Sequence, residues 1–177
     1  KTEDAKLVYE KAMAVSSATA DDKYSYYVDI ADTYYKNKNY PMALAEYKKA
    51  LEIKPKDEYL NIKLGNTYKG MSNLSSAIDY YNKAIEINPN NPDSYFNSGL
   101  CLAELNNLTA AKEKFSKVIE LKSDYAYAYY ALGLAYEKEN NIVDAVKNYE
   151  GFIEYTQDKN LKNNIQNKVN KLKKDLP

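Results

Sequence analysis

Residues 58–91 read EYLNIKLGNTYKGMSNLSSAIDYYNKAIEINPNN, and the pattern of this stretch returns along the chain every 34 residues. Five kinds of residue keep the period without slipping. They are small residues at Ala31, Gly65, Gly99 and Gly133, alanines at Ala43, Ala77, Ala111 and Ala145, aromatics at Tyr47, Tyr81, Phe115 and Tyr149, asparagines at Asn39, Asn73, Asn107 and Asn141, and glutamates at Glu52, Glu86, Glu120 and Glu154. A fixed period of this length is typical of proteins built from stacked repeats, and it favours binding over catalysis.

Each repeat carries helical spacing twice, with a break between. In the first repeat the apolar residues from Tyr27 to Tyr34 recur at helical intervals, which predicts a helix over residues 23–37. A turn follows in which Asn39 suits left-handed backbone angles and helix capping. The second helix starts near Pro41 and ends before Pro55, because proline suits a first helical turn but cannot continue a helix. The repeat is therefore predicted to be an antiparallel helix pair that must pack against its neighbours.

The repeat resembles the tetratricopeptide repeat family, whose signature runs Leu-Gly, Tyr, Ala, Phe and Pro. The second repeat carries this order as Leu64-Gly65, Tyr68, Ala77, Tyr81, Ala84 and Pro89, and the fourth as Tyr129, Leu132-Gly133, Tyr136, Ala145 and Tyr149. The third repeat departs from it, with Ser98 for leucine and Leu102 for tyrosine, and the last two repeats lack the final proline. The resemblance implies an all-α fold, a right-handed superhelical solenoid of antiparallel helix pairs.

We expect one domain over residues 1–177. Its predicted parts are a half repeat at 1–14, full repeats at 24–57, 58–91, 92–125 and 126–157, and a capping helix at 158–177. A loop is expected over Ala14–Ala20. The capping helix is predicted from an apolar stripe whose opposite face is lysine and asparagine, and terminal repeats need such a polar cover. The stripe consists of Leu161, Ile165, Val169, Leu172 and Leu176. Since the chain begins with Lys1, we expect it to be a fragment or a processed product.

Composition excludes several chemistries. There is no histidine, which rules out imidazole catalysis and histidine-containing metal sites. The single cysteine, Cys101, stands at a position taken by Thr67 and Ala135 in other repeats, so we expect a buried structural thiol. The formal net charge is zero, which favours neither nucleic acid nor an anionic membrane. The run Tyr125–Tyr136 is too short to span a bilayer. We predict no enzyme activity, catalytic residue, metal or cofactor, and the sequence assigns no compartment.

The family resemblance also implies a concave surface, lined by the first helix of each repeat, that binds peptides. The expected groove residues are Tyr59, Lys63, Asn66, Phe96, Asn97, Leu100, Tyr127, Tyr130 and Leu134. Asn66 and Asn97 match two asparagines with which some family members clamp the acidic tail of heat-shock chaperones. The basic partners of that clamp are replaced by Ile62, Tyr127 and Ala131. We therefore expect a protein or peptide ligand with apolar side chains.

Three functions remain open at this point. The first is a non-catalytic adaptor or scaffold that binds a peptide segment of a partner in the groove. The second is a scaffold that assembles with itself, end to end or through the groove, to give a homo-oligomer. The third is a regulatory or docking domain of a larger enzyme whose catalytic part is absent. The apolar groove surface also has two interpretations. Either it is open to a peptide, or it is covered by the C-terminal helix or by another copy of the chain.

Overall fold

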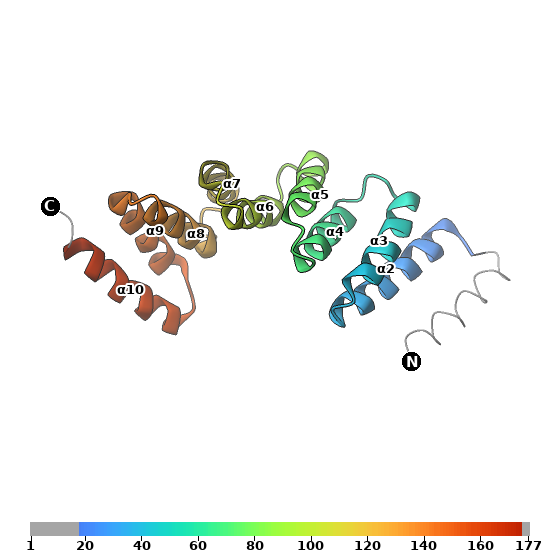
Figure 1. The fold of residues 1–177 in the computed structure, drawn as a ribbon, viewed down its shortest axis with the longest axis horizontal. Helices are drawn as coiled ribbons and strands as arrows, with labels where there is room; N and C mark the ends of the chain where they lie inside the picture. Colours follow the sequence, from blue (N-terminus) through green and yellow to red (C-terminus); the bar gives the residue numbers. More distant parts are fainter. Residues whose placement is uncertain (1–17, 175–177) are drawn as a thin grey trace. The chain divides into compact units, whose positions relative to one another are not determined.

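The computed structural model describes residues 18–174, and every helix or strand in this range is an α-helix. Consecutive helices form four pairs, followed by one further helix (Figure 1). They are α2 (Ala20–Lys36) with α3 (Tyr40–Ile53), α4 (Glu58–Gly70) with α5 (Leu74–Ile87), α6 (Pro92–Glu104) with α7 (Leu108–Leu121), α8 (Ala126–Lys138) with α9 (Ile142–Tyr155), and α10 (Lys159–Lys174). The half repeat predicted at 1–14 and Leu176 of the predicted stripe lie outside the described residues.

The first described helix begins earlier than predicted, at Ala20 instead of residue 23. Thr19 and Asp22 form a capping box, in which each side chain accepts a hydrogen bond from the backbone of the other. Because this arrangement satisfies amides that a helix start leaves unpaired, it extends α2 towards the N-terminus. Ala20, the last residue of the predicted loop, is therefore helical.

The described helices divide into two compact units between Pro89 and Asn90. We call residues 18–89, with α2 to α5, the N-terminal unit, and residues 90–174, with α6 to α10, the C-terminal unit. Within each unit every helix packs against the next one along the chain.

The turn inside each pair uses two consecutive residues for two tasks. The left-handed backbone angle falls on Lys38, Ser72, Asn106 and Asn140. The asparagine that follows is the N-cap of the second helix, and the side chains of Asn73, Asn107 and Asn141 accept a backbone amide there. Capping therefore explains three of the four asparagines, since a short side-chain acceptor satisfies an open amide at a helix start. Asn39 is the N-cap of α3 but its side chain makes no capping hydrogen bond, and the left-handed angle expected at Asn39 lies on Lys38.

The periodic glycines lie where the two helices of a pair touch. A Cβ atom on Gly65 would lie 2.6 Å from Cε1 of Tyr81, and one on Gly99 would lie 2.6 Å from Cε1 of Phe115. No described glycine has a positive φ angle, so close approach, and not backbone freedom, explains them. A larger side chain at Gly65 or Gly99 would therefore not fit between the two helices of its pair.

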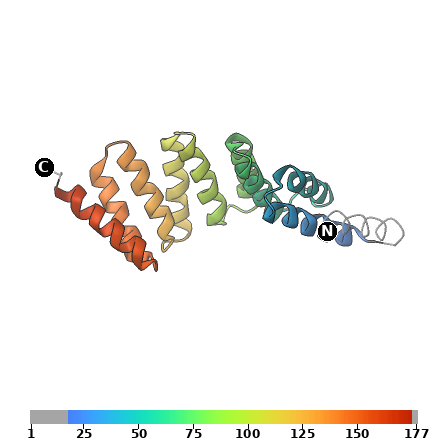
Figure 2. The ribbon, with the colours of Figure 1, turned by 60° about the horizontal axis from the view of Figure 1, so that its bottom comes forward.

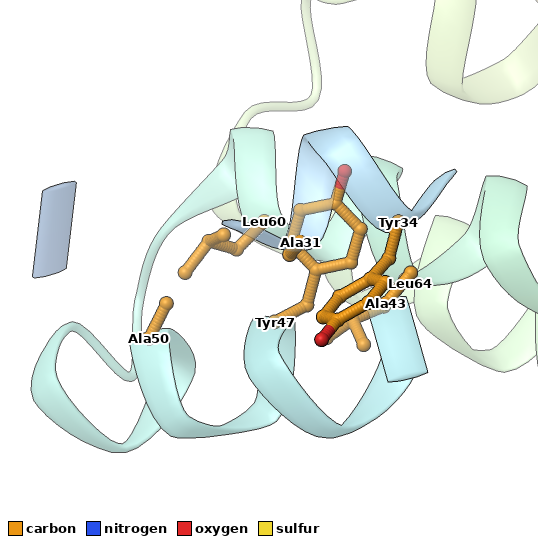
Figure 3. Close-up of a cluster of buried hydrophobic side chains, with 7 residues drawn as sticks. All are labelled: Ala31, Tyr34, Ala43, Tyr47, Ala50, Leu60 and Leu64. Carbon is orange, nitrogen blue, oxygen red and sulfur yellow. The ribbon is translucent and has the colours of Figure 1, made fainter. Parts of the chain in front are cut away.

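The buried core continues from one repeat into the next. In the N-terminal unit Leu60 and Leu64 of α4 join Tyr47 and Ala50 of α3, so the first helix of the second repeat covers the first repeat (Figure 3). At the other end Ile165 and Val169 of α10 are buried against α9. Figure 2 shows α10 lying beside α9.

Candidate functional site

The predicted groove residues lie on the first helices of three repeats. Tyr59, Lys63 and Asn66 are on α4, Phe96, Asn97 and Leu100 are on α6, and Tyr127, Tyr130 and Leu134 are on α8. The first three belong to the N-terminal unit and the other six to the C-terminal unit. Each group therefore has its own local surroundings.

In the N-terminal unit the predicted residues surround the carboxylate of Asp32. Three side chains donate hydrogen bonds to this carboxylate. The ammonium of Lys63 lies at 2.9 Å and the hydroxyl of Tyr59 at 3.2 Å from its oxygens, and the hydroxyl of the buried Tyr47 is the third donor. The ammonium of Lys63 lies 4.9 Å from the centre of the Tyr59 ring. Burial opposes ionisation of Asp32, but the hydrogen bonds from Tyr47 and Lys63 outweigh it, so its pKa lies below the ordinary value. The ammonium of Lys63 is therefore already paired inside the protein.

The two predicted backbone-reading asparagines have different surroundings. The side-chain oxygen of Asn66 accepts the hydroxyl of Tyr81 at 2.7 Å, which leaves its amide nitrogen as the group for a ligand. The amide nitrogen of Asn97 donates to the carbonyl of Asp93, one turn back in the same helix, at 2.9 Å. Asn66 belongs to the N-terminal unit and Asn97 to the C-terminal unit. Binding of one peptide by both asparagines therefore stays a prediction.

The C-terminal unit contains an apolar pocket with a volume of about 210 Å³. Three helices line it: Leu100 and Ala103 from α6, Leu108 and Phe115 from α7, and Ala131, Leu134, Ala135 and Lys138 from α8. It brings together two predicted groove residues, Leu100 and Leu134, and Leu134 is 42% exposed.

The residues that form this pocket replace a polar pair found in the preceding repeats. In the second repeat the Tyr81 hydroxyl donates to Asn66, a residue 15 positions earlier. The equivalent pair in the third repeat is Phe115 and Leu100, in which both the hydroxyl and its acceptor are absent. In the fourth repeat Tyr149 donates to Glu137, and Leu134 occupies the place of the acceptor. Two successive leucines on the first helices therefore make this region apolar.

The predicted aromatic residues differ in how far they are available to a partner. The Phe96 ring is half-buried, with its centre 5.8 Å from that of Phe115. Tyr130 is half-buried against Phe152, at 5.3 Å between ring centres. Tyr127 is 49% exposed, although it also contacts Phe152. Since Tyr127 and Leu134 are exposed with α10 in place, α10 does not cover this part of the surface.

Lys138 lies beside the pocket and is exposed. Lys63 pairs with Asp32, Lys112 with Glu139 and Lys168 with Glu137. Over residues 18–174 Lys138 has no ion pair of this kind, as is also true of other exposed lysines such as Lys38 and Lys147. Within this range no carboxylate lies at ion-pair distance from its ammonium.

Sequence reasoning missed six residues of the pocket: Ala103, Leu108, Phe115, Ala131, Ala135 and Lys138. One available signal was the loss of the tyrosine hydroxyl at Phe115, the single phenylalanine in its series, together with Leu100 replacing the polar residues of its own series.

Other features of the described chain give no second chemistry. Cys101 is fully buried, in agreement with the predicted structural thiol. Over residues 18–174 no group of three possible metal ligands comes together. In the same range no helix combines the length and the apolar character needed to cross a membrane. A further pocket, in the N-terminal unit, has a mixed lining, with Lys56, Lys83 and Glu86 beside Leu51, Pro55, Asn61 and Ile87.

Comparison with known proteins places the chain in a class of helical repeat proteins. Tetratricopeptide repeat models match residues 62–91, 80–113 and 127–155, and a TPR repeat model matches 31–72 and 99–140. The chain belongs to the tetratricopeptide repeat family, whose members are all-α solenoids of antiparallel helix pairs. Proteins of this family are typically non-catalytic protein-interaction modules. No curated protein sequence gives a significant match.

Several solved structures share the fold. A MamA structure aligns with a TM-score of 0.76 and 23% identity, over 87% of this chain and 88% of MamA. YrrB, described as a TPR protein with an unusual peptide-binding site, aligns with a TM-score of 0.76 and 26% identity, over 94% of this chain and 84% of YrrB. The first TPR of RPAP3, bound to the HSP90 peptide SRMEEVD, aligns with a TM-score of 0.65 and 20% identity, over 71% of this chain and 99% of that one. The MamA and RPAP3 similarities support the fold alone.

Proposed function

We propose that this protein is a non-catalytic adaptor that holds an apolar peptide segment of a partner protein on the first helices of its C-terminal unit. The observation that carries the proposal is the apolar pocket between α6, α7 and α8, which contains Leu100 and Leu134. Tyr127, exposed on α8, adds a rigid aromatic contact of the kind that interfaces favour.

The size of the pocket supports a side chain as its occupant. Small-molecule and cofactor sites usually measure about 300–1,000 Å³, and a cavity of about 150 Å³ accepts a benzene molecule. At about 210 Å³ this pocket suits a single apolar side chain. Burial of such a side chain contributes about 1.5–3 kcal/mol, enough for an anchor within a longer contact.

The electrostatics at the positions of the chaperone-tail clamp argue against an acidic tail held in that way. Lys63 is tied to Asp32, so binding a peptide carboxylate there requires breaking an internal ion pair. Ala131, at a position where the chaperone-tail clamp needs a cation, lines the apolar pocket instead. A buried carboxylate without cations costs several kcal/mol. The likeness to YrrB adds support for peptide binding in general, since YrrB has a peptide-binding site.

The test is a titration with a peptide selected from a random peptide library for binding to the full chain. We expect Leu134→Ala and Tyr127→Ala each to weaken binding by about 1–2 kcal/mol, because both side chains are exposed contacts at the proposed site. Val143→Ala is the matched control, since Val143 is 64% exposed on the second helix α9. Equal affinity for all four proteins would place the site elsewhere.

Self-assembly through the same pocket is separated by a second measurement. Sedimentation of the protein alone reports association between copies, and sedimentation of Leu134→Asp shows whether any association uses the pocket. A wild-type dimer that dissociates in this variant would replace the adaptor proposal by the self-assembling scaffold.

A further inference from the structure

We infer that the pair Leu100 and Phe115, with Lys138 beside it, determines ligand specificity and selects an aliphatic side chain next to an acidic group. The inference rests on the proposed function, because it names the kind of peptide segment that the same pocket takes. It concerns residues that the repeat pattern singles out as different from their equivalents in the chain.

The second and third repeats differ at two equivalent positions. In the second repeat Asn66 and Tyr81 are joined by a 2.7 Å hydrogen bond, so each polar atom has a partner. In the third repeat Leu100 and Phe115 occupy the same two positions and both line the pocket. A polar ligand atom placed between them would lose its hydration without gaining a hydrogen bond, which is costly. This pair therefore rejects a polar side chain and accepts an apolar one.

The wall of the pocket combines small and large apolar side chains. Ala103, Ala131 and Ala135 contribute small side chains, which leave the space, while Leu100, Phe115 and Leu134 supply the apolar contacts. Phe115 is only 1% exposed and contacts Phe96, so its ring is fixed by the core and cannot swing to admit a different shape. The pocket therefore favours leucine, isoleucine or methionine.

One residue of the pocket lining is charged. Lys138 lines the pocket, is exposed, and forms no ion pair with residues 18–174. A lysine can lay its alkyl stem along an apolar surface while its ammonium reaches a charged group. The complementary ligand carries a carboxylate beside its anchor, either from aspartate or glutamate or from a free C-terminus.

The experiment is a binding selection from a random peptide library on the intact chain. Its central variant is Leu100→Asn with Phe115→Tyr, which installs the pair of the second repeat. The control is the reciprocal variant Asn66→Leu with Tyr81→Phe in the N-terminal unit, and thermal melting verifies that each variant is folded.

Leu134→Asp, at an exposed position, places a carboxylate beside the pocket and serves if the central variant does not fold. Lys138→Glu tests the charge, and peptides with free and amidated C-termini separate the two sources of carboxylate.

We expect wild type and the reciprocal variant to enrich aliphatic residues next to acidic ones. The central variant, or Leu134→Asp in its place, should lose that enrichment and bind the wild-type peptide about tenfold more weakly, the effect of losing one apolar anchor. Peptides selected by Lys138→Glu should still carry an aliphatic residue, but with a basic residue beside it in place of the acidic one. If wild type enriches aliphatic residues but the central variant enriches them equally, the pair does not determine specificity. If wild type enriches no apolar segment at all, the proposed function itself is contradicted.

Discussion

The contact between Gly99 and Phe115 gives a stability prediction with an unusual sign. Replacing a glycine by alanine within a helix normally stabilises it by about 1 kcal/mol. At Gly99 the new Cβ atom would lie 2.6 Å from Cε1 of Phe115, whereas carbon atoms make favourable contact at about 3.5–4.0 Å. Phe115 is 1% exposed and cannot withdraw into solvent.

Overpacking of a filled core costs about 1–3 kcal/mol, which exceeds the gain in helix propensity. We therefore expect Gly99→Ala to destabilise the protein by about 1 kcal/mol and Gly99→Leu by about 3 kcal/mol or more. In thermal unfolding followed by circular dichroism, each 1 kcal/mol should lower the Tm by about 2–4 °C for a chain of this size.

A double-mutant cycle with Phe115→Leu tests the cause. The smaller side chain should relieve the clash, so that Gly99→Ala costs less in the Phe115→Leu background, with a coupling of about 0.5–3 kcal/mol. An increase in Tm for Gly99→Ala alone, or strictly additive effects in the cycle, would refute the contact.

Three further outcomes are expected. Ser98→Ala should raise the free energy of unfolding by about 1 kcal/mol more than the exposed control Ser116→Ala, because the buried hydroxyl of Ser98 has no hydrogen-bond partner in the described structure. Equal effects of the two substitutions in chemical denaturation would contradict this expectation. Asp32→Asn should be less stable than wild type near pH 7, and the difference in stability should shrink as the pH falls below about 4, because a lowered folded-state pKa contributes stability that is lost as the carboxylate is protonated. A difference that does not change between pH 7 and the lowest pH at which the protein is folded would exclude the charge of Asp32 as its source. Deletion of residues 159–177 should expose the apolar face of α9 and lower the Tm or cause association, and an unchanged monomer would show that α10 is not a cap.

The helix pairs and the closest helix contacts were predictable because they depend on local patterns. Apolar spacing within 15 residues indicates a helix, and a glycine that recurs with the repeat indicates a close contact. Gly65 and Tyr81 meet as this logic requires. The start of α2 was missed by three residues, because the capping box of Thr19 and Asp22 was not weighed against the apolar spacing.

The candidate site was predictable only in part, because a pocket depends on side chains that meet from separate helices. Leu100 and Leu134 were identified from their place on the first helices. Phe115 was recognised only as a member of the aromatic series, and it both belongs to the core and lines the pocket. The pairing of Lys63 with Asp32 depends on the packing of α4 against the first repeat, which no spacing along one helix reveals.

The central claim is that an apolar peptide segment binds between α6, α7 and α8, and methyl NMR on the full chain tests it most directly. On titration of the library-selected peptide, we expect the largest shifts for the methyl groups of Leu100, Ala131 and Leu134, which line the pocket. The signals of the methyl groups of Leu51 and Ile87, which line the pocket of the N-terminal unit, should not shift. Shifts confined to Leu51 and Ile87, with Leu100 and Leu134 unaffected at saturation, would contradict the account.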